Sequence, residues 1–107
     1  NASSQIHHKA IDFIHKIAQP STYNCHLCQL TYGNVGKRKS WKDFEEQLPL
    51  SISYYHKDEF VTSFPNFSNE DFPIILLDDE LLFSGSDMKN WNLDDLKQEI
   101  SKVIKSP

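Results

Sequence analysis

The first twenty residues carry apolar side chains with the period of a helix. These side chains recur at steps of three and four, at Ile6, Ala10, Phe13, Ile14 and Ile17. Such steps place side chains on one stripe of a helix. Ser3 or Ser4 can cap the helix at its start, and Pro20 ends it. The pattern therefore predicts an amphipathic helix between the serines and Pro20.

A second helix and a strand are expected in the middle of the chain. Gly33 and Gly36 mark a loop, after which Ser40 opens a helix that Pro49 closes. One face of this helix carries Trp41, Phe44 and Leu48. Apolar and polar residues then alternate over Leu50–His56, which is the period of a half-buried strand.

The C-terminal half is expected to add a hairpin and a last helix. A helical turn over Asp58–Phe64 and a polar loop over Pro65–Asp71 come first. The runs Ile74–Leu77 and Leu81–Ser84 flank an acidic turn, and they predict an antiparallel hairpin. Asn92 can cap the final helix. Its apolar positions are Leu93, Leu96, Ile100, Val103 and Ile104.

Composition indicates one globular domain over residues 1–107, since a chain of 107 residues is long enough for a single core. With a net charge of −4, a nucleic-acid or membrane partner is not expected. The longest apolar run, Pro73–Leu77, is far shorter than the roughly 20 residues of a membrane span. Gly33–Arg38 is too short for a GxxxxGK[ST] phosphate loop, so nucleotide hydrolysis is not expected. We therefore expect a cytoplasmic globular domain.

Both cysteines lie in one short segment, which reads YNCHLCQLTYG. Cys25 and Cys28 are separated by two residues, and such a CxxC pair has three interpretations. It can form a reversible disulfide, supply two ligands to zinc, or consist of two small core residues. The pair alone is compatible with all three.

The order of the elements around this pair resembles that of the thioredoxin fold. The resemblance implies an α/β domain with a small mixed sheet flanked by helices, and a CxxC pair at a helix N-terminus. It also implies a cis-proline at the start of a hairpin beside the cysteines, and Pro73 stands at that position. We therefore predict a cis Phe72–Pro73 bond. No strand precedes Cys25 in the predicted order, so the first strand is expected to be missing from this sequence.

The cysteine segment also resembles a family of small uncharacterised bacterial proteins. The resemblance rests on the pattern TYxCxLCxLTYG, which residues 22–33 match, and on HKDEF at residues 56–60. It covers the whole chain and implies that the residues of interest lie in these two motifs. It brings no activity with it.

A redox pair is the first functional interpretation of the cysteines. Cys25 would be the attacking thiol, because a helix N-terminus and a protonated His26 both lower a thiol pKa. Cys28 would then be the resolving thiol. In a thioredoxin-like site, Pro73 would expose backbone to a substrate peptide. The chain would carry out thiol–disulfide exchange or redox sensing on a protein thiol or disulfide, without a cofactor.

A metal site is the second functional interpretation. Zinc takes four ligands in structural sites, and Cys25 and Cys28 supply two. His15 precedes the pair by ten residues, and His56 ends the strand expected over Leu50–His56, so these are the best candidates for the other two. The chain would then be a non-enzymatic domain with structural or regulatory zinc that docks a partner protein.

Overall fold

The chain folds around a four-stranded mixed sheet. The structure, a computed structural model, describes residues 10–16, 26–33 and 36–105. The strands of the sheet are β1 Ala10–His15, β4 Ser51–His56, β5 Ile74–Leu77 and β6 Glu80–Phe83. They lie in the order β4-β1-β5-β6. β4 runs parallel to β1, whereas β5 and β6 are antiparallel to their neighbours, so β1 is a central strand.

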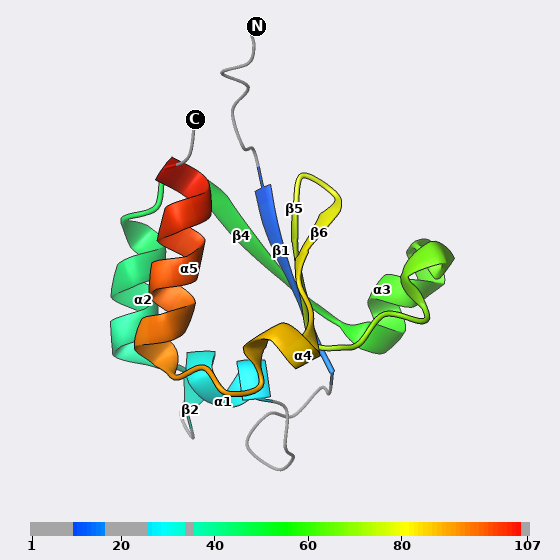
Figure 1. Ribbon diagram of the computed structural model, residues 1–107, viewed down its shortest axis with the longest axis horizontal. Coiled ribbons are helices and arrows are strands. Elements are labelled where there is room, and N and C mark those ends of the chain that lie inside the picture. The colour runs from blue at the N-terminus through cyan, green and yellow to red at the C-terminus, as the bar shows by residue number, and fades with distance from the viewer. Residues whose placement is uncertain (1–9, 17–25, 34–35, 106–107) are drawn as a thin grey trace, which may run out of the picture.

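Helices cover the two faces of this sheet unequally. The helices are α1 His26–Thr31, α2 Lys39–Glu46, α3 Lys57–Ser63, the 3-10 helix η2 Pro65–Phe67, α4 Gly85–Met88 and α5 Leu93–Lys105. A small hairpin, β2 Tyr32–Gly33 and β3 Gly36–Lys37, follows α1. Figure 1 shows α2 and α5 on one side of the sheet, α3 on the other side, and α1 and α4 at one end.

The strand β1 corrects the prediction for the N-terminal segment. A helix through Ala10, Phe13 and Ile14 is wrong, because Ala10–His15 is extended. Ile11, Phe13 and Ile14 are all fully buried, so β1 is apolar on both faces and lacks the alternation of a half-buried strand. The strand that was expected to be missing is therefore β1 itself. The rest of the predicted helix lies outside the described residues.

Two hydrophobic clusters occupy the two faces of the sheet. The first contains Ile11, Phe13, Leu27, Cys28, Trp41, Ile75, Met88, Leu96 and Ile100. The second contains Ile14, Phe60, Phe72, Ile74 and Leu76. β1 contributes to both, because successive side chains of a strand point to opposite faces. We call the face under the first cluster the α2–α5 face, and the other the α3 face.

The remaining predicted elements are confirmed. α2, β4, α3, the β5–β6 hairpin and α5 lie at or beside the expected residues. Asn92 caps α5, since its side-chain oxygen accepts the backbone N–H of Asp95 at 2.8 Å. Three elements were not predicted, namely the β2–β3 hairpin, α4 and the 3-10 helix η2, which begins the segment expected as a polar loop. Ser84 caps α4 through reciprocal hydrogen bonds with Asp87.

The architecture is that of a thioredoxin-like α/β fold. α1 follows the central strand β1, β4 returns parallel to β1, and an antiparallel hairpin and a final helix complete the chain. The Phe72–Pro73 peptide bond is cis, as predicted. None of the described helices combines the length and the apolar character that a membrane crossing requires.

Candidate functional site

A histidine and a cysteine meet in the core at the end of β1. Nδ1 of His15 lies 2.9 Å from the sulfur of Cys28, within hydrogen-bonding distance. Cys28 is completely buried, and only 5% of His15 is exposed. The interaction is therefore shielded from water, which strengthens a polar contact and raises the cost of breaking it.

Local structure explains why these two side chains meet. His15 is the last residue of β1, and it follows Ile11 and Phe13 on the α2–α5 face at intervals of two. Cys28 is in α1, between Leu27 and Gln29, and its helix packs that residue into the cluster on the same face. The end of the strand and the buried side of the short helix thus bring the two groups together.

Aromatic rings enclose the His15 side chain. Its ring stacks on Tyr54 of β4, with centroids 5.9 Å apart and planes 14° from parallel. Tyr32 of β2 meets the His15 ring edge to face at 5.8 Å, and it meets Tyr54 in the same way at 5.9 Å. Phe13 is tilted against His15 at 6.4 Å. The ring is thus held on several sides.

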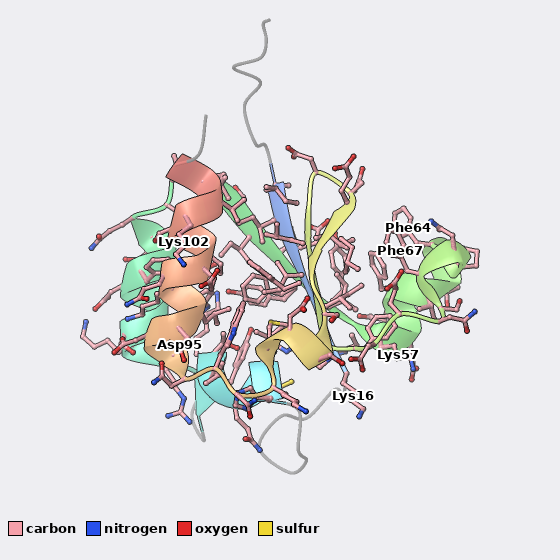
Figure 2. All side chains as sticks on the ribbon, viewed as in Figure 1. Lys16, Lys57, Phe64, Phe67, Asp95 and Lys102 are labelled. Atoms are coloured by element: carbon pink, nitrogen blue, oxygen red, sulfur yellow. The ribbon has the colours of Figure 1, made fainter. Side chains whose placement is uncertain are left out.

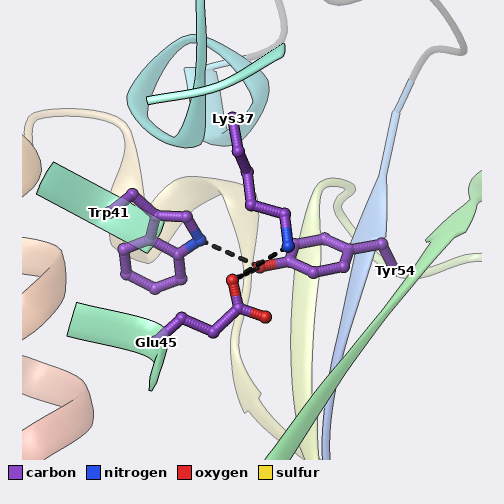
Figure 3. Close-up of polar contacts among 4 residues, drawn as sticks. All are labelled: Lys37, Trp41, Glu45 and Tyr54. Atoms are coloured by element: carbon purple, nitrogen blue, oxygen red, sulfur yellow. Dashed lines mark hydrogen bonds and ion pairs between the residues drawn. The ribbon is translucent and has the colours of Figure 1, made fainter. Parts of the chain in front are cut away.

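A polar network fixes Tyr54 from its other end, as Figure 3 shows. The indole N–H of Trp41 donates to the Tyr54 oxygen at 2.9 Å, and the Tyr54 hydroxyl donates to Glu45 Oε1 at 3.0 Å. Lys37 Nζ pairs with the same Glu45 oxygen at 2.9 Å and lies 4.5 Å from the centroid of the Tyr54 ring. These four residues come from α2, β3 and β4.

The two tyrosines beside His15 are held in their neutral form. Burial is the main cause that raises the pKa of Tyr54, and the charge of Glu45 acts in the same direction, whereas the Trp41 hydrogen bond opposes them. Burial likewise raises the pKa of Tyr32, with further contributions from Glu45 and from Cys28. Both hydroxyls therefore keep their hydrogens at neutral pH.

His26, one of the two residues between the cysteines, is anchored elsewhere. Nε2 of His26 lies 2.6 Å from the backbone carbonyl of Trp91, so this nitrogen donates its hydrogen to that oxygen. Trp91 precedes α5 and packs edge to face against Phe83 of β6 at 4.9 Å. The contact ties the start of α1 to the segment that leads into α5.

The other two residues of the predicted redox site are Cys25 and Pro73. Cys25 lies outside the described residues. Pro73 is buried and directly precedes Ile74, the β5 residue that faces Ile14 of β1. This register places Pro73 at the end of the sheet where β1 finishes with His15. The chemical roles of Cys25 and Pro73 stay predictions.

His56, the second predicted zinc ligand, lies beside His15 in the sheet but is engaged differently. The two residues are Cα partners across β4 and β1. His56 is exposed, and its Nδ1 lies 3.7 Å from Glu59 Oε1, which also accepts the His56 backbone N–H at 3.5 Å. His15 thus lies against Cys28, whereas His56 lies against Glu59.

The described residues do not assemble a metal centre. Residues 10–16, 26–33 and 36–105 contain no group of three or more histidine, cysteine or acidic side chains that could hold an ion. Two ligands of one tetrahedral zinc would stand about 3.5 Å apart for nitrogen and sulfur. His15 Nδ1 and the Cys28 sulfur are closer than that, at 2.9 Å.

Sequence reasoning missed the residues around His15. No role in the site was given to Tyr54, Tyr32, Glu45 or Lys37. The alternation over Leu50–His56 was sufficient to place Tyr54 inward. Its position beside His15 required the parallel register of β1 and β4, which no local pattern reveals.

Comparison with protein-family models, with curated proteins and with solved structures gave no match for this chain.

Proposed function

We propose that this chain is a thiol–disulfide redox or redox-sensing protein in which Cys25 and Cys28 form a reversible disulfide. The observation that carries the proposal is the buried contact between His15 Nδ1 and the Cys28 sulfur. A hydrogen bond to a thiolate favours the charged form and lowers the thiol pKa. The thioredoxin-like arrangement of β1, α1 and the hairpin supports the same function.

The proposed reaction is a two-step exchange. The Cys25 thiolate attacks one sulfur of a substrate disulfide, and the other substrate sulfur leaves as a thiolate that takes a proton from water. The Cys28 thiolate, stabilised by His15, then attacks Cys25 in the mixed disulfide. A bond forms between the two cysteines, and the second substrate thiolate leaves. The substrate is reduced by two electrons and the cysteine pair is oxidised.

The partner we propose is a protein thiol or disulfide in the cytoplasm. Its alternative is a zinc ion on the same cysteines in a non-enzymatic interaction domain. The two differ in what freshly purified protein contains, since a redox pair holds either two thiols or one disulfide and no metal. Native mass spectrometry of protein purified without chelator distinguishes them directly.

A redox titration tests the function. Protein is equilibrated at a series of ratios of reduced to oxidised glutathione and alkylated, and its mass is measured by mass spectrometry. We expect one two-electron transition, which Cys25→Ser and Cys28→Ser should each abolish. His15→Phe keeps a ring but removes the hydrogen bond, which is worth about 1.5–3 kcal/mol to a charged group. The midpoint should fall by about 30–60 mV, because the reduced state loses its stabilisation.

His56→Phe is the matched control for the histidine variant. His56 is the Cα partner of His15. The His56 side chain is exposed and lies close to Glu59 rather than to Cys28. The midpoint of His56→Phe should stay at the wild-type value. A cysteine pair that never forms a disulfide across the series, or one stoichiometric zinc per chain, would reject the redox function.

A further inference from the structure

The two ring nitrogens of His15 have different surroundings. Nδ1 faces the Cys28 sulfur at 2.9 Å. Nε2 is buried, and no hydrogen-bond partner for it exists among the described residues. The titratable groups that face the ring are Cys28 from α1, Tyr32 from β2 and Tyr54 from β4. Within the part of the chain that the structure describes, His15 thus has a partner for Nδ1 and none for Nε2.

This asymmetry selects one tautomer. A neutral imidazole carries its hydrogen on one nitrogen and a lone pair on the other. Buried N–H groups without an acceptor are rarer in proteins than acceptors that lack a donor. The hydrogen is therefore favoured on Nδ1, where the Cys28 sulfur accepts it, and the lone pair is left on Nε2. In this tautomer His15 is a donor to sulfur.

Tyr54 is the residue that keeps the ring in this orientation. It presents its face to the His15 ring, with an angle of 14° between the planes. Its own oxygen is held by Trp41 and Glu45, so the tyrosine ring has little freedom to turn. Lys37 adds a charged contact to both Glu45 and the tyrosine face. The restraint thus extends from a partly exposed ion pair to the buried histidine.

We propose that Tyr54, anchored by Trp41 and Glu45, is a positioning residue that holds His15 with its Nδ1–H donating to the Cys28 sulfur. This inference deepens the proposed redox function, because it names the residue that tunes the resolving cysteine. The tautomer and its dependence on Tyr54 do not require turnover, so they can be measured separately from that function.

Nitrogen chemical shifts of ¹⁵N-histidine-labelled, reduced protein at pH 7 measure the tautomer. In the wild type we expect hydrogen on Nδ1 of His15 and none on Nε2. Tyr54→Leu should lose this preference, so that both tautomers are populated. Tyr55→Leu is the matched control: Tyr55 is the next residue of β4, packs against Phe60 at 5.7 Å, and should leave the His15 shifts unchanged. Hydrogen on Nε2 in the wild type would overturn the inference.

The reduction potential supplies the second measurement. Loss of an oriented donor to the Cys28 thiolate should change the equilibrium with glutathione by about three- to tenfold, which corresponds to about 15–30 mV toward lower potential. If Tyr54→Leu changes neither the reduction potential of the Cys25–Cys28 pair nor the His15 tautomer, the inference is rejected and the redox function is kept. If Tyr54→Leu loses the Nδ1–H tautomer but the cysteines form no reversible disulfide in the titration, the inference is kept and the redox function is rejected.

Tyr54→Phe guards against a leucine variant that does not fold. It keeps the ring and its stack on His15 but removes both hydrogen bonds to the tyrosine oxygen. Without the anchor, the Nδ1–H population and the potential should both move in the same direction as in Tyr54→Leu, by a smaller amount. Wild-type values for both quantities in Tyr54→Phe would show that the anchor has no effect and would overturn the proposal.

Discussion

The two faces of the sheet are built in different ways. On the α2–α5 face the cluster around Phe13 and Trp41 is closed from solvent, and both residues are 0% exposed. On the α3 face a single helix and η2 cover one end, and Phe64 of this region is 45% exposed. Figure 2 shows Phe64 and Phe67 on the side away from α2 and α5.

The two faces also differ in how they hold polar side chains. The α2–α5 face holds the buried His15–Cys28 contact and the partly buried Tyr54 network. The α3 face carries Asp12, whose Cα partner Leu76 belongs to the second cluster. Burial is the main cause that raises the pKa of Asp12, and the charges of Asp79 and Asp78 add to it. Polar groups on the α2–α5 face thus have hydrogen-bond partners, whereas the Asp12 carboxylate on the α3 face is destabilised by its surroundings.

We expect the largest loss of unfolding free energy from a substitution in the core of the α2–α5 face. Trp41→Ala removes a fully buried ring that packs on Phe13 at 5.4 Å and binds Tyr54, so it should cost about 3–5 kcal/mol of unfolding free energy. Phe64→Ala removes a ring that stacks on Phe60 at 4.9 Å but is largely exposed, and it should cost about 1 kcal/mol. Urea unfolding measures both. Equal losses would contradict the difference between the faces.

We expect a smaller difference in unfolding free energy between substitutions on the two faces of β4. Tyr54→Phe leaves the Trp41 indole N–H without its acceptor and leaves the Glu45 carboxylate with Lys37 alone, so we expect a loss of about 1–3 kcal/mol. Tyr55→Phe changes a side chain that is 37% exposed, and it should stay within about 0.5 kcal/mol of the wild type. The comparison uses adjacent residues and the same chemical change, with unfolding in urea as the readout. A larger loss for Tyr55→Phe would reverse the assignment of the faces.

These comparisons also explain which parts of the fold were predictable. β4 was recognised because one of its faces is exposed and its polar residues alternate with apolar ones. β1 was not, because it is covered on both faces, and its spacing at Ala10, Phe13 and Ile14 also fits a helix. Its identity as a strand depends on pairing with β4, some forty positions later in the chain, and with β5. Such distant partners leave no local pattern.

The candidate site was predictable only in part. His15 was expected near the cysteines as the residue that ends the element before them, and this holds although the element is a strand rather than a helix. His56 was chosen on the same reasoning and lies at the same end of the sheet. Its position at the start of α3, beside Glu59, gives it another partner. Proximity along the sheet could be predicted, whereas the direction of a side chain could not.

The smallest expected effect concerns Asp12 on the thinly covered face. Because its pKa is raised above 3.8, the folded state binds this proton more tightly than the unfolded state does. Stability from this group is therefore present at low pH and is lost as the pH rises through the raised pKa. Asp12→Asn should raise the unfolding free energy at pH 7 by less than about 1 kcal/mol, since the site is partly exposed and screened.

The gain from Asp12→Asn should shrink as the pH falls through the raised pKa of Asp12, and urea unfolding at pH 7 and at acidic pH measures the change. Asp94→Asn is the control of opposite sign, because Asp94 lies in the first turn of α5 and interacts favourably with the helix dipole. Its loss should lower stability at pH 7 by a few tenths of a kcal/mol. If Asp12→Asn were the less stable protein at pH 7, then Asp12 would have a favourable charged partner, and the α3 face would organise polar groups as the α2–α5 face does.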